Sequence, residues 1–298
     1  VDDQKVKVVS IIGSVKDKLR VNKVLNTFKV QTIYHAAAYK HVPLVEFNTS
    51  EGVLNNSFGT LVVAEEAIEA NVETFVLIST DKAVRPTNTM GAAKRIAELV
   101  LQALSKKSHN TCFSIVRFGN VLDSSGSVIP IFRRQIKNGG PITVTDKKIV
   151  RYFMTIPEAV ELVIQAGAMA KGGDVFLLDM GKPVLIYDLA VRMIELSGLK
   201  LMNDDNPDGD IEIRFTGLRP GEKLYEELLV GGNVLPTENK LIMSASESMI
   251  DWELLKPVLD ELIDSSLKLD QRKIRDLMIK LVPEFKPQSK IDDLLYKI

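Results

Sequence analysis

The feature that most constrains this chain is a regular alternation between short apolar runs and longer amphipathic stretches. The apolar runs predict strands at 6–12, 30–36, 74–79, 112–118 and 175–179. The amphipathic stretches predict helices at about 16–28, 49–71, 88–107, 127–138 and 157–170. Near-continuous apolar strands separated by helices are typical of a parallel sheet with helices on both faces. We therefore predict an α/β fold with a doubly wound parallel sheet, and ligands are expected at the carboxyl ends of its strands.

The pattern changes after about residue 180. A turn-rich acidic loop follows at 203–210, and two polar amphipathic helices are predicted at about 251–265 and 270–281. We assign residues 1–180 to a Rossmann-like cofactor-binding domain. Residues 181–298 are assigned to a smaller α+β region that binds substrate and ends in helices.

The glycine-rich turn of a dinucleotide-binding sheet is absent from the sequence. Such a sheet normally opens with a strand, a glycine-rich turn and a helix whose N-terminus holds the pyrophosphate. The chain has no GxGxxG or GxxGxxG, and the segment at 11–17 (IIGSVKD) has a single glycine. We therefore expect the sheet to be incomplete at its N-terminus and the chain to be a fragment of a longer protein. The 298 residues alone are then expected to show little turnover.

Composition argues against several classes of function. Lys and Arg (38) nearly balance Asp and Glu (39), so no broad basic surface favours nucleic acid. The chain lacks an apolar run of about 18 residues, so we expect no membrane contact from this segment. Three histidines and one cysteine, without HxxxH or CxxC spacing, predict no metal site. The single Cys112 allows no internal disulfide, which fits a reducing cytoplasm.

Three polar residues, Thr80, Asp81 and Lys82, directly follow the apolar run at 74–78. They are therefore expected at the carboxyl end of a buried strand, where ligands bind. A carboxylate and an amine at such an edge are suited to acid–base catalysis. Asp81 also fits a turn cap, and Lys82 a solvated charge.

Two further segments point to the same edge of the sheet. The segment at 35–46 follows a strand, and its first small side chains would let a flat cofactor approach the backbone: Ala36, Ala37 and Ala38. Lys40 and His41 are then expected to point into the cleft, although a tightly packed turn is an alternative. On the helix at 88–107, Met90 and Lys94 are four residues apart and share one face.

A series of motifs occurs in order over residues 35–229: HAAAYKHVP, NNSFGT, STDKAVRPTN, MGAAKR, RFGNVLDSSGSVIPIF, GGPITVT, RYFMTIPEAV and GLRPGEKLYEEL. With them the chain resembles the UDP-N-acetylglucosamine 4,6-dehydratases of the extended short-chain dehydrogenase/reductase superfamily. This family serves bacterial capsule, O-antigen and flagellar-glycan synthesis. Met90 replaces the superfamily's usual tyrosine, which is similar to a large membrane-anchored subgroup whose dehydratase domain is cytoplasmic.

The resemblance implies a reaction on UDP-N-acetylglucosamine with a tightly bound, recycled NADP or NAD. Hydride leaves C4 of the sugar, water is lost across C5 and C6, and the hydride returns to C6. The product is a UDP-4-keto-6-deoxy sugar. The elimination needs an acid near O6 and a base near C5. Homo-oligomers are usual in the superfamily, and we expect one here by analogy.

The resemblance also implies roles for single residues. Asp81 would protonate the departing hydroxyl, and Thr80 would hydrogen-bond the C4 oxygen. Lys82 would be the base at C5, which requires burial and the nearby Lys94 to depress its pKa. Lys94 would hold the nicotinamide ribose, and Asn55 is similar to an asparagine that braces the active-site strand. The implied cofactor-binding residues are Ala36, Ala37, Ala38, Lys40, Asn55 and Lys94.

Substrate-binding residues follow from the same resemblance. Asn120 would meet the UDP diphosphate, and Thr143 and Thr145 lie in a segment that would wrap the uracil. Arg219 presents paired donors that suit a pyrophosphate, and Glu222 can accept from a ribose hydroxyl. Lys40 and His41 complete this set. Arg151 fits either a phosphate contact or a structural ion pair.

Met90 leaves one step without a proton acceptor, because a thioether cannot replace the tyrosine that takes the C4 hydroxyl proton. Tyr39, on the loop after the preceding strand, or Lys82 acting through Thr80 is the hypothesis for that acceptor. Tyr39 also fits a packing aromatic.

Two other interpretations stay open. A UDP-sugar epimerase on the same scaffold would oxidise C4 without eliminating water, but it has no leaving group for Asp81 to protonate. A catalytically silent, UDP-sugar-binding fragment is favoured by the absent glycine loop.

Overall fold

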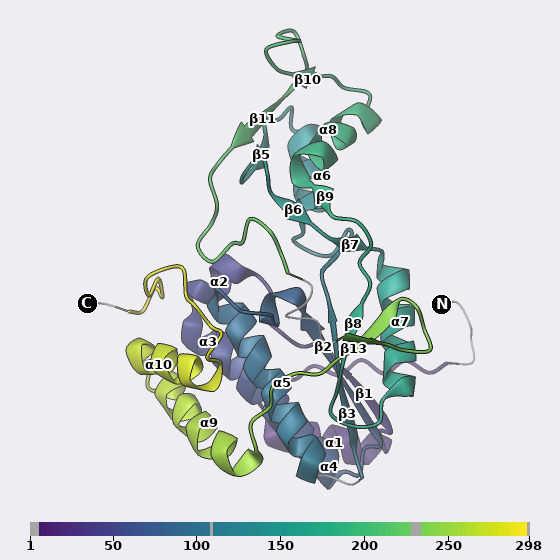
Figure 1. Ribbon diagram of the computed structural model, residues 1–298, viewed down its shortest axis with the longest axis vertical. Coiled ribbons are helices and arrows are strands. Elements are labelled where there is room, and N and C mark those ends of the chain that lie inside the picture. Colours follow the sequence, from purple (N-terminus) through teal and green to yellow (C-terminus); the bar gives the residue numbers. More distant parts are fainter. Residues whose placement is uncertain (1–5, 108–109, 228–233, 297–298) are drawn as a thin grey trace.

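The computed structural model describes residues 6–107, 110–227 and 234–296, and its largest element is a six-stranded sheet (Figure 1). The strand order is β1 (Thr32–His35), β2 (Thr74–Thr80), β3 (Cys112–Phe118), β8 (Asp174–Leu178), β13 (Ile242–Ala245) and β12 (Val234–Pro236). The first four strands are parallel, β13 pairs with β8 in antiparallel orientation, and β12 pairs with β13 in antiparallel orientation. The predicted α/β fold with a parallel sheet is confirmed, and the antiparallel strands extend it at one edge.

Helices cover both faces of the sheet. Phe75 and Leu77 on β2 point into one hydrophobic cluster, and Val76 between them points into another. The first cluster includes side chains of α1 (Lys18–Phe28), α4 (Gly59–Glu69), α5 (Thr89–Lys107), α9 (Trp252–Leu267) and α10 (Gln271–Leu281). The second cluster includes side chains of α7 (Ile156–Met169). A strand buried on both faces has to be apolar at nearly every position, which explains the run at 75–78.

Short elements connect these parts. They are α2 (Val42–Glu46), α3 (Thr49–Val53), a π-helical turn (Leu54–Phe58), a 3₁₀ turn (Asp81–Ala83), β4 (Asn120–Val121), β6 (Val150–Arg151), β7 (Phe153–Met154) and β9 (Val184–Leu185). None of the helices in the described part of the chain has the length and apolar character needed to cross a membrane.

A smaller lobe projects from the sheet domain (Figure 1). Its separate hydrophobic core comes from α6 (Val128–Lys137), β5 (Ile142–Val144), α8 (Ile186–Leu196), β10 (Leu201–Met202) and β11 (Ile211–Phe215). The lobe therefore contains residues from both sides of the domain boundary expected at 180. The helices α9 and α10, which were assigned to the C-terminal region, pack against the sheet domain. Tertiary packing decides this division, because the segments that share a core are separated in sequence.

The predicted strand at 6–12 is wrong. This segment forms no strand, and its apolar side chains are exposed, with Ile12 at 92%. Among the described strands β1 pairs only with β2, so the segment has no neighbour with which to form a ladder. Strand propensity describes a side chain that fits a pleated, half-buried surface, and here that surface is missing.

Candidate active site

A cavity of about 360 Å³ lies at the carboxyl ends of β1, β2 and β3. Its lining includes Ala36, Ala38, Lys40, His41, Thr80, Lys82, Met90, Lys94 and Asn120. Parallel strands end at one edge of a sheet, so residues far apart in sequence meet there. The structure thus brings together most of the residues predicted for catalysis and cofactor binding, although Ala37, Tyr39, Asn55 and Asp81 are not part of the lining.

Asp81 lies directly behind the cavity wall and is 1% exposed. Its Oδ1 accepts hydrogen bonds from Thr80 Oγ1 at 2.8 Å and from Lys82 Nζ at 3.0 Å. Its Oδ2 is buried and has no hydrogen-bond partner among the described residues. A Cβ at Gly119, which lines the cavity, would lie 3.2 Å from that oxygen. Asp81 Oδ2 therefore lies next to Gly119, a residue of the cavity lining.

Lys82 is paired with two carboxylates, which corrects the expectation for its pKa. Its side chain is 18% exposed, and its Nζ lies 3.0 Å from Asp81 Oδ1 and 3.4 Å from Glu226 Oε1. Burial lowers the pKa of the Lys82 amine, but the charges of Asp81 and Glu226 outweigh burial, so the pKa is raised. The expected depression was wrong because Asp81 pairs with this amine and because the sequence pattern did not show that Glu226 approaches it.

The depressed amine is Lys94. Burial lowers its pKa to about 8, and its Nζ donates to the carbonyl oxygen of Ile78 at 2.7 Å. The helix α5 that carries it is capped by Asn88, whose side chain accepts from Gly91 N at 2.8 Å. A Cβ at Gly91 would lie 2.1 Å from the carbonyl oxygen of Lys82, so glycine lets the helix approach the 3₁₀ turn at Asp81–Ala83.

Asn56, rather than Asn55, braces the loop after β1. Its side-chain amide accepts from the backbone N–H of Tyr39 at 2.8 Å and donates to the carbonyl of Tyr39 at 3.0 Å. Asn55 is half-buried and donates to Asn56 Oδ1 at 3.1 Å. Asn56 shares the buried helical face with Thr60, four residues on, and this spacing is the signal that distinguishes it from Asn55.

Replacing Asn56 by alanine is expected to destabilise the fold by about 1–3 kcal/mol, because the fully buried Asn56 side chain makes two hydrogen bonds to the backbone of Tyr39 that alanine cannot make. Asn55→Ala is the matched control and should change stability by less than about 0.5 kcal/mol. Urea unfolding of both variants measures the difference. Equal effects of the two substitutions would contradict the assignment of the brace to Asn56.

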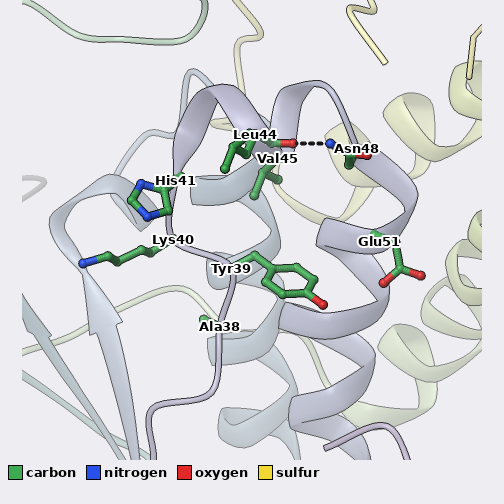
Figure 2. A pocket seen from close by; sticks show the side chains of 8 residues that line it. All are labelled: Ala38, Tyr39, Lys40, His41, Leu44, Val45, Asn48 and Glu51. Atoms are coloured by element: carbon green, nitrogen blue, oxygen red, sulfur yellow. Dashed lines mark hydrogen bonds between the residues drawn. The ribbon is translucent and has the colours of Figure 1, made fainter. Parts of the chain in front are cut away.

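Tyr39 lines a different, neighbouring cavity of about 530 Å³ (Figure 2). Figure 2 shows its ring extending toward Glu51, whereas the Lys40 side chain extends to the opposite side. Lys40 and His41 line both cavities. Tyr39 is not in the lining of the cavity that Thr80 and Lys82 share. Two proton acceptors were considered for the C4 hydroxyl, Tyr39 and Lys82 acting through Thr80. Only for the second do all the residues line the same cavity.

The loop after β11 brings several predicted substrate residues together. Glu222 Oε1 lies 3.4 Å from Thr145 Oγ1 and 3.3 Å from Arg151 Nη2, and Glu222 Oε2 accepts from Arg219 N at 3.1 Å. Arg151 also donates to the carbonyl oxygens of residues 150, 223 and 224, so it has the structural pairing considered for it. The Arg219 side chain is exposed.

The other two predicted substrate residues lie apart from this loop. Asn120 lines the cavity and donates to the carbonyl oxygen of Tyr152 at 3.2 Å. Thr143 lies in the small lobe, where its hydroxyl accepts from Gln135 Nε2 at 2.7 Å.

Two charged groups near the site were not identified from the sequence. Glu226 reaches Lys82 from a distant loop, and Glu98 forms a buried network with Arg117 behind Ser79. Glu98 falls on the same face of α5 as Lys94, so helical spacing gave a signal that it is buried. Among the described residues, no group of three or more His, Cys, Asp or Glu side chains is arranged to hold a metal ion.

Comparison with known proteins identifies the family. The family model described as polysaccharide biosynthesis protein matches residues 1–247. The capsular polysaccharide biosynthesis protein CapD of Staphylococcus aureus is 56% identical over 234 residues, which are 78% of this chain and 38% of CapD. The chain therefore spans less than half the length of that relative.

Solved structures share the fold. The X-ray structure of Pen from Bacillus thuringiensis has a TM-score of 0.70 and 34% identity, over 84% of this chain and 81% of Pen. The dTDP-glucose 4,6-dehydratase DesIV from Streptomyces venezuelae, solved with NAD and TYD bound, has a TM-score of 0.63 and 20% identity, over 91% of this chain and 81% of DesIV. With the family model matching most of its length, the chain belongs to the polysaccharide biosynthesis protein family and has a Rossmann-like α/β fold.

Proposed function

We propose that the chain carries the catalytic site of a nucleotide-sugar 4,6-dehydratase that converts UDP-N-acetylglucosamine to a UDP-4-keto-6-deoxy sugar for bacterial surface polysaccharide. The observation that carries the proposal is the contact of Asp81 Oδ1 with Lys82 Nζ at 3.0 Å, beside a cavity at the carboxyl edge of the sheet. The match to the polysaccharide biosynthesis family supports it.

The pair suits an elimination, which removes a proton from C5 and delivers one to O6. Lys82 lines the cavity and can receive the C4 hydroxyl proton through Thr80. It can pass this proton to Asp81 Oδ1, 3.0 Å away, and as a free amine it can then take the C5 proton. Asp81, when protonated, can give its proton to O6 as the C6–O6 bond breaks and water leaves. The electrons of the C5–H bond then form the C5–C6 double bond. Thr80, which touches both Asp81 and the cavity, is placed to orient the C4 oxygen.

The residues around the cavity fit the nicotinamide end of NADP or NAD. Ala36 and Ala38 present only a methyl group to the cavity, and Lys94 supplies a buried amine beside them. When bound, the nicotinamide supplies removal of hydride from C4 and its return at C6. The NAD held by the DesIV structure, which has the same fold, supports this choice of cofactor.

An epimerase on the same scaffold is the second candidate. It would use the cavity, the cofactor and the nucleotide, but it releases no hydroxyl group from C6. The buried Asp81 oxygen without a partner favours elimination, because elimination needs an acid that can protonate the leaving O6, whereas epimerisation needs none.

Incubating the natural gene product with UDP-N-acetylglucosamine tests these alternatives. A dehydratase gives a product that has lost one water and shows the alkaline absorbance of a keto sugar. An epimerase gives a product of unchanged mass, and a silent UDP-sugar-binding protein gives none while still binding UDP in calorimetry. Either of the last two results would overturn the proposal.

Arg219→Ala is expected to weaken UDP binding by about 10- to 100-fold, because a hydrogen bond to a charged group contributes about 1.5–3 kcal/mol. Arg214→Ala is the matched control, because Arg214 is also exposed and pairs with Glu212 on β11. Isothermal calorimetry with UDP measures both variants. Unchanged affinity in Arg219→Ala would remove this residue from the proposed diphosphate site.

A further inference from the structure

Glu226 is a buried carboxylate that reaches the catalytic turn from a distant loop. Its side chain is 3% exposed, and its Oε1 lies 3.4 Å from Lys82 Nζ and 3.7 Å from Arg151 Nε. Its Oε2 is buried without a hydrogen-bond partner among the described residues. A buried carboxylate oxygen left unpaired is costly, so packing alone does not account for a glutamate at this position.

The groups that face Lys82 come from several elements. Asp81 approaches from the same turn, Glu226 from the loop after β11, and Arg151 from β6 behind Glu226. The cationic or titratable side chains that share the cavity are those of Lys40, His41 and Lys94. Lys82 therefore lies between two carboxylates, and of these Glu226 is the one that comes from a distant part of the sequence.

We propose that Glu226 is a positioning residue of this site: it holds the Lys82 ammonium against Asp81 and sets the pH at which Lys82 becomes a free amine. The catalytic consequence rests on the dehydratase function proposed above, whereas the charge effect on Lys82 does not. Glu226 shares its loop with Arg219 and Glu222. The loop proposed to hold the nucleotide thus also controls the proton on the proposed C5 base.

The sign of the effect follows from the contacts. A carboxylate within 4 Å of an amine favours the ammonium form, so removing its charge lowers the pH at which the amine is free. Glu226→Gln keeps the size and shape of the side chain and removes the charge. Glu227→Gln is the matched control, because Glu227 pairs with Arg85 and Lys223 and makes no contact with Lys82.

Competitive acylation with acetic anhydride measures this pH directly, because only the free amine reacts. The extent of labelling at Lys82 is followed against pH by mass spectrometry of its peptide in wild type, Glu226→Gln and Glu227→Gln. We expect the labelling midpoint in Glu226→Gln to fall by about one pH unit or more, which makes Lys82 about tenfold more reactive below the midpoint. The midpoint in Glu227→Gln should match wild type. An unchanged midpoint in Glu226→Gln overturns the proposal.

A second variant covers a failure of Glu226→Gln to fold, which circular dichroism would show. Glu226→Asp keeps the charge but shortens the side chain by one methylene, so the labelling midpoint should fall by less than one pH unit. No shift, or an upward shift, contradicts the proposal.

If the midpoint falls as expected but no keto sugar forms in wild type, the positioning role stands and the dehydratase function fails. If keto sugar forms, the rising limb of turnover against pH should move with the labelling midpoint.

Discussion

Replacing Arg117 by methionine is expected to destabilise the protein by about 3–5 kcal/mol, because it leaves a buried carboxylate without its main partner. Glu98 on α5 is fully buried, and Arg117 on β3 contacts both of its oxygens, with Nε at 2.8 Å from Oε1 and Nη2 at 2.6 Å from Oε2. Arg95 contacts Glu98 Oε2 at 3.0 Å and offsets only part of the loss. Urea unfolding, with the midpoint and slope compared to wild type, gives the change in free energy.

Arg133→Met is the matched control for this variant. Arg133 forms an exposed ion pair with Asp123 at 3.1 Å, and such a pair contributes about 0–1 kcal/mol. If Arg117→Met costs no more than Arg133→Met, the buried network does not hold β3 against α5 as described.

The same network makes stability depend on pH in acid. Burial raises the pKa of Glu98, but the charges and hydrogen bonds of Arg117 and Arg95 outweigh burial and bring the pKa down to about 2. A carboxyl whose pKa is lower in the folded state contributes stability above its unfolded pKa of 4.5, and this contribution is lost as pH falls toward 2. Arg117→Met should remove this contribution. The difference in free energy of unfolding between wild type and variant should therefore become smaller as the pH falls from 4.5 toward 2.

Lys82→Met is expected to lower turnover of UDP-N-acetylglucosamine by about 10²- to 10⁴-fold, the range that general acid–base catalysis supplies. Methionine keeps much of the side-chain volume but cannot take a proton from C5. Because the nucleotide is proposed to bind through the loop after β11, UDP affinity should change little. The measurement combines keto-sugar formation with UDP calorimetry on the same preparation.

Lys106→Met serves as its control, because Lys106 lies at the far end of α5 and forms an exposed pair with Asp251. Its turnover should equal wild type. A Lys82→Met protein with near-normal turnover would remove Lys82 from the chemistry, whatever the role of Asp81.

The sequence was sufficient for the parts of the fold that depend on local patterns. The apolar runs at 74–79 and 112–118 became β2 and β3, and their parallel ends placed Thr80, Lys82 and Asn120 around one cavity. The spacing of Met90 and Lys94 likewise placed both side chains in the same lining. In each case a short-range period determines the position of the side chain.

What the sequence could not show depends on contacts between distant segments. The raised pKa of Lys82 comes from Asp81 and from Glu226, and Glu226 belongs to a loop whose path no local pattern predicts. The small lobe joins α6 and β5 to α8 and β11 across the expected domain boundary. The apolar segment at 6–12 has strand character but no paired neighbour in the described structure.

The Asp81–Lys82 pair is proposed to eliminate water across C5 and C6 of a UDP-linked sugar. The most direct test is to incubate the natural gene product with UDP-N-acetylglucosamine in D₂O and to analyse the product by mass spectrometry and NMR. The proposed mechanism predicts a 4-keto-6-deoxy sugar with one deuterium at C5, because the proton removed there is replaced from solvent while hydride returns to C6. A product that keeps the hydroxyl groups at C4 and C6 would contradict the proposed mechanism. A keto sugar that retains its original hydrogen at C5 would also contradict the mechanism.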